Sequence, residues 1–164
     1  MIAATGALLV VMAALRSLAD ATGPVCVIDE NTLSVNGKRQ GGRCHGGTPV
    51  RLLAIDAPEL KQACKHPSGR GFLCSRFAAG FLLDLVRDKR VFCKGDNRDQ
   101  HRRLLAICHV NGEDLNARMV REGWALGEHR LSKKYTAEET TAKQANKRLW
   151  GMQFTPPWEW RKNH

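Results

Sequence analysis

The chain has 164 residues, with 26 Lys or Arg against 16 Asp or Glu, which gives a formal net charge of +10. This length predicts one domain with a sizeable core, and the charge favours a polyanionic partner, either nucleic acid or an anionic membrane surface. No run of five or six like charges occurs, so the composition argues against a disordered basic tail.

The N-terminal segment differs in composition from the rest. Residues 2–15 are almost wholly apolar but fall short of the roughly 20 residues that span a bilayer. The run is typical of a signal-peptide core, with small residues suited to cleavage at 17–19 or 19–21. No Lys or Arg precedes it, so an uncleaved membrane anchor or a misplaced start codon is the alternative. We expect a leader over 1–21 and a domain over 22–164, either exported to the periplasm or medium or anchored to the membrane.

Six cysteines support export, because an even number in an exported chain suggests disulfide bonds. None forms a Cys-x-x-Cys pair, so a zinc site or a thioredoxin-like motif is poorly supported. Six cysteines allow fifteen pairings, and spacing alone does not choose among them. They are Cys26, Cys44, Cys64, Cys74, Cys93 and Cys108.

In the first half of the domain, the sequence predicts three strands and then a helix. Residues 25–39 indicate two short strands separated by a polar turn, and Asn36-Gly37 is a hairpin signal. A glycine-rich loop leads to a third strand over 50–55. Residues 58–74 are predicted to form a long surface loop, and the helix over 75–88 has Ser75 as its candidate N-cap.

The second half predicts two strands and two helices. Strands over 90–95 and 102–110 precede a turn at Asn111-Gly112. The helix over 113–123 has Asp114 or Glu113 as its cap and closes at Gly123. The helix over 135–151 opens with a capping box from Thr136 to Glu139. The tail that follows is stiffened by prolines, and its two tryptophans are expected to pack on the domain.

This order of elements predicts an α+β protein that is mainly β. Five short strands interrupted by a helix after the third suit a five-stranded barrel of the oligonucleotide/oligosaccharide-binding (OB) type, with about three helices. The pattern alone leaves other α+β folds open.

The strand over 50–55 carries a charged residue on an apolar face. By alternation, Arg51 shares this face with Leu53 and Ile55, so it needs either a partner or a ligand. Asp56 and Glu59 follow just past the strand end. The plain interpretation is a structural ion pair between Arg51 and one of these carboxylates.

Two further stretches favour a chemical role. The turn of Asp29, Glu30 and Asn31 offers side-chain oxygens that suit calcium or magnesium, although acidic turns are more often simply solvated. Residues 98–103 supply arginines at the head of the last strand. Together these groups make phosphodiester hydrolysis plausible: a cation holds water, a carboxylate acts as general base, and guanidinium groups grip the phosphate.

From about Val25 to Trp150 the sequence resembles the staphylococcal nuclease (thermonuclease) family. "VRLLAIDAPE" is similar to the family's R-L-x-x-I/V-D-x-P-E signature, and "VIDENTL" to its V-I-D-G-D-T segment. "DQHRRLLA" stands where the family has D-x-Y-G-R-x-L-A. "DLNARMVREGWA" resembles the family's helix pattern N-x-x-L-V-x-x-G-x-A.

The resemblance implies an OB-type barrel and a calcium-dependent endonuclease that acts on DNA and RNA. We expect a monomer without a stable protein partner. It implies that Arg51 and Arg103 hold the scissile phosphate and that Glu59 is the general base. Asp56 would ligate calcium, or another divalent cation, through its carboxylate, and Ala57 through its backbone carbonyl.

The sequence departs from the family at several of these positions. Asn31 replaces the family's second metal aspartate and Glu30 replaces a glycine, so calcium binding should weaken unless Asp29 or Glu30 compensates. His101 and Arg102 replace the Tyr-Gly pair before Arg103. The alternative function is therefore an OB-fold module that binds nucleic acid with weakened catalysis.

The resemblance also bears on the cysteines. On the family's fold, one bridge would clip the loop before the first helix and another would cross two adjacent late strands. The expected pairs are Cys64–Cys74, Cys93–Cys108 and Cys26–Cys44.

Overall fold

The computed structural model describes residues 20–164 of the chain. The leader predicted over 1–21 lies outside this range except for its last two residues. Ala21 is already the buried first residue of strand β1, where it pairs with Cys93. Within the described range, no helix combines the length and the apolar character needed to cross a membrane.

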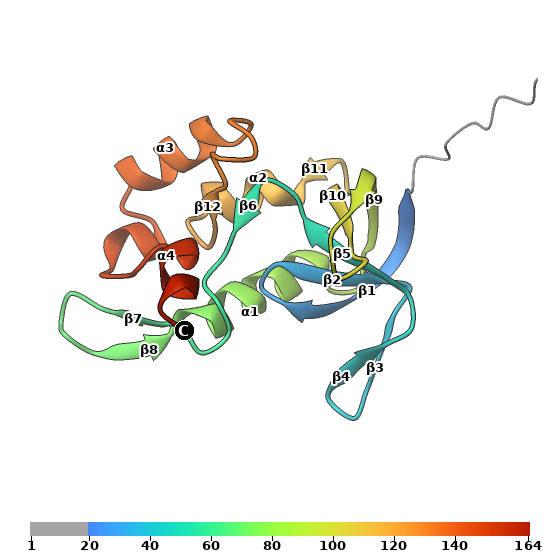
Figure 1. Cartoon of the computed structure of the whole chain (residues 1–164), viewed down its shortest axis with the longest axis horizontal. Coiled ribbons are helices and arrows are strands. Elements are labelled where there is room, and N and C mark those ends of the chain that lie inside the picture. The colour runs from blue at the N-terminus through green and yellow to red at the C-terminus, as the bar shows by residue number, and fades with distance from the viewer. Residues whose placement is uncertain (1–19) are drawn as a thin grey trace, which may run out of the picture.

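Five strands close into a ring, as the OB-type prediction requires (Figure 1). The ring order is β1, β2, β5, β10 and β9, and β9 closes it by pairing with both β10 and β1. The β5–β10 pair is parallel and the other pairs are antiparallel. The strands are β1 (Ala21–Asp29), β2 (Thr32–Val35), β5 (Thr48–Leu52), β9 (Arg90–Arg98) and β10 (Leu104–Val110).

Strand β9 bends where it passes from one partner to the next. Between the pairs Asn97–Leu105 and Lys94–Ile107, β9 advances three residues against two in β10, which is a β-bulge. Gly95 lies at this bulge, and a Cβ there would meet the Leu105 carbonyl oxygen at 2.1 Å. A glycine is therefore required for the close approach that closes the ring.

The ring encloses the main core, which two helices complete. Leu33, Val50 and Leu104 are almost fully buried inside the ring. Helices α1 (Cys74–Val86) and α2 (Leu115–Arg121) pack Leu82 and Met119 into the same cluster. Asp114 caps α2 by accepting a hydrogen bond from the Ala117 amide, so the predicted cap is confirmed for one of its two alternatives.

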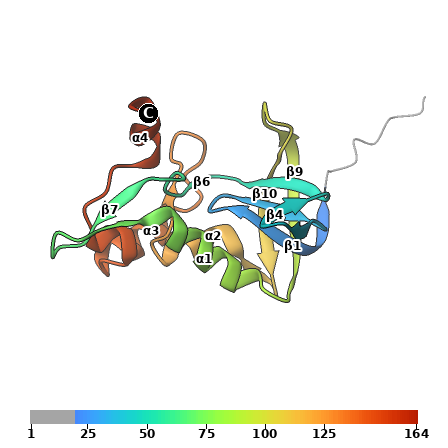
Figure 2. The same ribbon diagram turned by 90° about the horizontal axis from the view of Figure 1, so that it is seen from below.

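Seven of the other elements form a second layer beside the ring (Figures 1 and 2). They surround a smaller apolar cluster built on Leu126, Leu149 and the Cys64–Cys74 bridge, with Trp158 packed against it. These elements are β6 (Ile55–Asp56), β7 (Ala63–Lys65), β8 (Gly71–Leu73), β12 (Leu126–Gly127), α3 (Thr136–Gln144), the 3-10 helix Arg148–Gly151 and α4 (Pro157–Lys162).

All three expected disulfides are present, and no cysteine in the described residues is free. Cys93–Cys108 joins β9 to β10 across the ring, and Cys64–Cys74 ties the β7–β8 hairpin to the start of α1. Cys26–Cys44 fastens the hairpin of β3 (Lys38–Gln40) and β4 (Arg43–His45) to β1.

Several turn predictions need correction. Asn36-Gly37 turns the chain, but the flanking strands do not pair with each other, because β2 pairs with β5 and β3 with β4. The glycine-rich loop includes β4, which pairs with β3 just before the loop, and the loop predicted over 58–74 contains the β7–β8 hairpin. Asn111-Gly112 does form a hairpin turn, between β10 and β11 (Glu113–Asp114).

The predicted helix caps at Ser75 and Thr136 are wrong. Ser75 lies inside α1, because the helix already begins at the disulfide-bonded Cys74 and has no side-chain cap. The Thr136 hydroxyl donates to the Lys133 carbonyl, and the Glu139 carboxylate accepts from the Gly127 amide. Neither side chain of the predicted capping box therefore caps α3.

The strand predicted over 50–55 is shorter than expected. It ends at Leu52, and Ala54 takes a positive φ of 63°. The Leu53 amide donates to the Ala106 carbonyl, and the Asn116 amide group donates to the Leu53 carbonyl at 2.9 Å. These contacts turn the chain out of the ring, so Arg51 and Ile55 do not share a strand face.

Candidate active site

One pocket of about 590 Å³ collects most of the predicted site residues. The β1–β2 turn, β5, the loop after β6, the β9–β10 turn and the C-terminal helix all contribute to its wall. Arg51 and Arg103 therefore face the same pocket, together with Glu59. The lining residues used below are Asp29, Glu30, Asn31, Thr32, Arg51, Glu59, Asp99, Arg103 and Arg161.

A bulge in β1 shapes the acidic turn. Between the pairs Val27–Leu33 and Asp29–Thr32, β1 advances two residues against one in β2, and the extra residue turns Asp29 toward the pocket. The Asp29 carboxylate accepts a hydrogen bond from the backbone N–H of Asn31 at 2.8 Å. This contact fixes the turn that carries Asn31.

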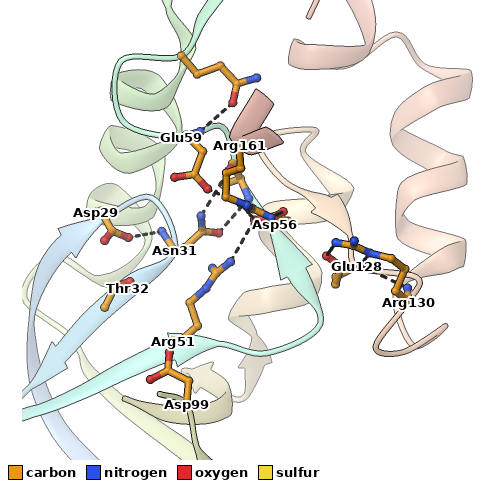
Figure 3. A network of polar contacts seen from close by, with 12 residues as sticks. Asp29, Asn31, Thr32, Arg51, Asp56, Glu59, Asp99, Glu128, Arg130 and Arg161 are labelled. Carbon is orange, nitrogen blue, oxygen red and sulfur yellow. Dashed lines mark hydrogen bonds and ion pairs between the residues drawn. The ribbon is translucent and has the colours of Figure 1, made fainter. Parts of the chain in front are cut away.

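Asn31 is bonded to the backbone of Ala57 in both directions (Figure 3). Its side-chain oxygen accepts the Ala57 N–H at 2.9 Å, and its Nδ2 donates to the Ala57 carbonyl at 3.4 Å. The two predicted metal ligands thus lie together, but each already has a partner. An amide oxygen has a second lone pair, so Asn31 keeps one acceptor position.

Arg51 reaches from β5 to Asp56, which lies behind the pocket wall. Its Nη2 donates to Asp56 Oδ1 at 3.1 Å, so the ion-pair interpretation of Arg51 is correct. Burial lowers the pKa of the Arg51 guanidinium, and the Asp56 carboxylate counteracts this. Arg51 Nη1 is buried without a hydrogen-bond partner in the described part of the chain. An orphaned charged donor in a pocket wall is suited to an anionic ligand.

Arg103 is held at the other side of the pocket by local contacts. Its Nη2 lies 2.7 Å from Asp99 Oδ2, and its Nη1 donates to the Thr32 hydroxyl at 3.2 Å. Burial raises the pKa of Asp99, but the hydrogen bonds and charge of Arg103 outweigh it, so the net shift is downward. Asp99 therefore remains an anion that orients Arg103.

Glu59 follows β6 in a tight turn closed by Gln62. The Gln62 side-chain oxygen accepts the Glu59 amide at 2.9 Å, and its Nε2 donates to the Thr155 carbonyl at 2.6 Å. The Gln62 side chain is completely buried. It therefore fixes the Glu59 turn against the segment that precedes α4.

Arg161, on α4, bridges the two carboxylates (Figure 3). Its Nη2 lies 2.6 Å from Asp56 Oδ2, and its Nη1 contacts both Asp56 Oδ1 and Glu59 Oε1. These contacts, those with Asp56 above all, raise the pKa of Arg161 above its usual value. Asp56 thus shares its two oxygens between two guanidinium groups.

Glu30 is a further carboxyl group in the pocket wall. Burial raises its pKa to about 8, and the neighbouring Asp29 and Glu59 add to this effect. Glu30 is therefore largely protonated at neutral pH and supplies little charge for a metal ion.

The donor types in this corner suit a hard divalent cation, because they are carboxylate, amide and carbonyl oxygens. Their present partners are nitrogen donors, among them Arg161 at Asp56. Residues 20–164 contain no cluster of three or more Asp, Glu, His or Cys side chains arranged to hold a metal ion. A cation at Asp56 therefore has to share or displace the contacts of Arg161.

Arg161 is the site residue that sequence reasoning missed. The sequence predicts a tail stiffened by prolines and no helix there, but residues 157–162 form a helix with proline at its first position. A sequence signal was present, because Glu159 lies in the first turn and Arg161 and Lys162 in the last, as the helix dipole favours. Nothing in the pattern indicated that this helix would reach Asp56.

The ring of five strands and its pocket of arginines and carboxylates define an α+β protein of the OB type. Residues 49–152 match the family described as staphylococcal nuclease homologue, and the chain belongs to this family. The resemblance of the sequence to this family is thereby confirmed.

Three similar proteins have names that refer to endonucleases. "Endonuclease YncB" of Bacillus subtilis (strain 168) is 33% identical over 105 residues, which are 60% of this chain and 43% of that protein. An "uncharacterized endonuclease" of Haemophilus influenzae is 29% identical over 116 residues, 69% of this chain and 60% of that protein. "SPbeta prophage-derived endonuclease YokF" of Bacillus subtilis is 36% identical over 81 residues, 46% of this chain and 25% of that protein. The chain thus spans less than two thirds of each relative.

Proposed function

We propose that this chain is an endonuclease that hydrolyses phosphodiester bonds of DNA or RNA in the pocket described above. The observation that supports this most is the convergence of Arg51, Arg103 and Glu59 on one pocket, where a buried Arg51 donor has no partner among residues 20–164. The net charge of +10 also favours a polyanionic substrate. The names of the similar proteins agree with this class of activity.

Each residue has a role that its position allows. Glu59, at the pocket wall, accepts the proton of the attacking water. Arg51 and Arg103 bind the phosphate oxygens and stabilise the charge that grows on them in the transition state. Asp56 orients Arg51 through their ion pair, and Asp99 orients Arg103.

Calcium, or another divalent cation, is the proposed cofactor; when bound, it supplies positive charge to the phosphate and lowers the pKa of a coordinated water. Its proposed ligands are the carboxylates of Asp56 and Asp29, the Ala57 carbonyl and the Asn31 side-chain oxygen. Asn31 is neutral, so we propose weaker calcium binding and lower activity than an aspartate there would give.

We further propose that the protein acts outside the cytosol, as a monomer. Three disulfides are typical of proteins that fold in an oxidising compartment, such as the periplasm or the medium. The leader proposed over 1–21 would direct export, or would remain as a membrane anchor.

Degradation of plasmid DNA and of a long RNA tests the function, first with calcium and then with excess chelator. We expect cleavage that chelator abolishes and that Glu59→Ala reduces by about 10²–10⁴-fold, the usual contribution of a general base. Asp84→Asn is the matched control, because Asp84 is an exposed carboxylate on α1 whose partner is Arg87. It should cleave like the wild type.

Tight, salt-sensitive binding of nucleic acid without cleavage would contradict the nuclease and favour the alternative binding module. The engagement of both Asp56 and Glu59 by Arg161 is the feature that would favour that outcome.

A further inference from the structure

The C-terminal helix places a fixed positive charge where the proposed metal ion would bind. We propose that Arg161 competes with the divalent cation for Asp56 and at the same time occupies Glu59, the proposed base, so that calcium binds only as this guanidinium leaves the two carboxylates. The inference rests on the proposed function, because it takes these two carboxylates to be part of a cation-dependent site.

Arg161 occupies the carboxylate oxygens of Asp56 that a divalent cation would need. One guanidinium bridges both carboxylates, with Nη2 on one oxygen of Asp56 and Nη1 on the other and on Glu59. The Asp56 side chain is only 2% exposed, so it has no second open face toward solvent. A guanidinium has five donors and no acceptor, and it does not lose its proton in proteins. Arg161 therefore yields the carboxylate oxygens only by moving away.

The local charge explains why its departure matters. With Arg161 in place, the pocket brings together four carboxylates (Asp29, Asp56, Glu59 and Asp99) and three guanidinium groups (Arg51, Arg103 and Arg161). Without Arg161, the same four carboxylates are matched by only two guanidinium groups. Because the affinity of an oxygen site for calcium rises with its uncompensated negative charge, removal of Arg161 strengthens calcium binding.

Arg161 is also placed where it can move. Helix α4 has six residues, and only Pro157 in it is buried. Trp158 anchors its start against the second apolar cluster, whereas the Arg161 side chain in the last turn is 40% exposed. A short helix with few buried side chains opens at low free-energy cost, so the ion pair can open without unfolding the ring.

Calorimetric titration of the whole protein with calcium chloride tests the proposal. We expect Arg161→Gln to bind calcium at least about tenfold more tightly than the wild type, since an uncompensated carboxylate is gained. The matched control is Lys162→Gln, which removes the same charge from the same helix, but Lys162 pairs with Glu159 away from the pocket. This control should bind calcium as the wild type does.

A thermal-unfolding series with and without calcium gives a second readout. Calcium should raise the Tm of Arg161→Gln more than that of the wild type or of Lys162→Gln, because tighter binding stabilises the folded state. Arg161→Lys keeps the charge but cannot bridge two carboxylates in the same way, so it should give an intermediate affinity.

Unchanged or weaker calcium binding by Arg161→Gln would overturn the proposal, as would the absence of calcium binding in all variants. The plasmid assay separates this failure from that of the proposed function. Cleavage with unchanged calcium affinity would leave the nuclease and remove the competition. Tighter calcium binding by Arg161→Gln without cleavage by any variant would support the competition and contradict the nuclease.

Discussion

Two buried carboxylates, Asp56 at the pocket and Glu139 on α3, have similar surroundings but different uses. Both side chains are nearly inaccessible, with exposures of 2% and 5%, and both contact cationic groups. Glu139 accepts hydrogen bonds from the Gly127 amide and from Lys143, and its Oε2 lies 2.7 Å from His129 Nε2. All these partners lie within 12 residues of Glu139, and none of them lines the pocket.

One partner of Asp56 comes from much farther away in the sequence, and both of its partners also face a cavity. Arg161 is 105 residues distant in sequence, and both Arg51 and Arg161 also line the pocket. A buried ion pair alone therefore does not mark a functional site, since Glu139 is explained by the packing of α3 on the β12 segment. Asp56 differs from Glu139 in two respects. Its partners Arg51 and Arg161 converge on a cavity, and Arg51 Nη1 has no hydrogen-bond partner among the described residues.

The largest expected effect tests the pocket side of this comparison. Arg51→Lys should lower nuclease activity by about 10²–10³-fold, because a lysine cannot pair with Asp56 and present a second donor to the phosphate. Initial rates on plasmid DNA measure this, and circular dichroism checks the fold. Arg130→Lys is the control, because Arg130 pairs with Glu128 outside the pocket. Equal losses in both variants would break the comparison.

The next largest effect tests the structural role of Glu139. Glu139→Gln should lower the free energy of unfolding by about 1–3 kcal/mol, because it leaves Lys143 and the Gly127 amide with a weaker acceptor. Urea denaturation measures this loss. Activity per folded molecule should not change, and a selective loss of activity would place Glu139 in the site.

The stabilisation by Glu139 should disappear in acid. Burial raises its pKa, but hydrogen bonds and the charge of Lys143 outweigh this, so the pKa in the folded protein is lowered. A group with a lowered folded pKa stabilises above its unfolded pKa, near 4.5, and loses this contribution as the pH falls through its folded pKa. The stability difference of about 1–3 kcal/mol between wild type and Glu139→Gln should therefore shrink from pH 7 toward pH 3. A constant difference would contradict this assignment.

The smallest effect concerns Glu30, whose pKa shift is upward and therefore opposite in sign to that of Glu139. Its folded pKa is raised from 4.5 to about 8, so the wild type loses stability as the pH rises from 5 to 8. Relative to the wild type, Glu30→Gln should gain about 1 kcal/mol of unfolding free energy over the single pH unit from 5 to 6, since a difference of one bound proton is worth about 1.4 kcal/mol per pH unit. Urea denaturation at both pH values measures the gain. Parallel pH profiles would show that Glu30 is already ionised at neutral pH.

The sequence predicted the ring well because its strands depend on local alternation. Val25, Val27, Leu33 and Val35 carry the β-branched and apolar pattern that a half-buried strand requires. The family motifs then located Arg51, Glu59 and Arg103, and the structure brings all three to one pocket.

The parts that sequence reasoning missed depend on distant contacts. The break after Leu52 is held by Ala106 and Asn116, more than 50 residues away, which no local pattern encodes. The place of Arg161 depends in the same way on the packing of Trp158 and on the return of the chain past Gln62. Local propensity specified the helix, whereas tertiary packing decided what it touches.

The buried side-chain amide of Gln62 has a practical consequence for anyone who prepares this protein. It ties the Glu59 turn to Thr155, so a recombinant form truncated before that residue would leave Nε2 without its acceptor and loosen the Glu59 turn. An affinity tag fused after His164 would extend from the helix that carries Arg161, beside the mouth of the pocket. Such a tag should be cleavable, and assays should use protein from which it has been removed.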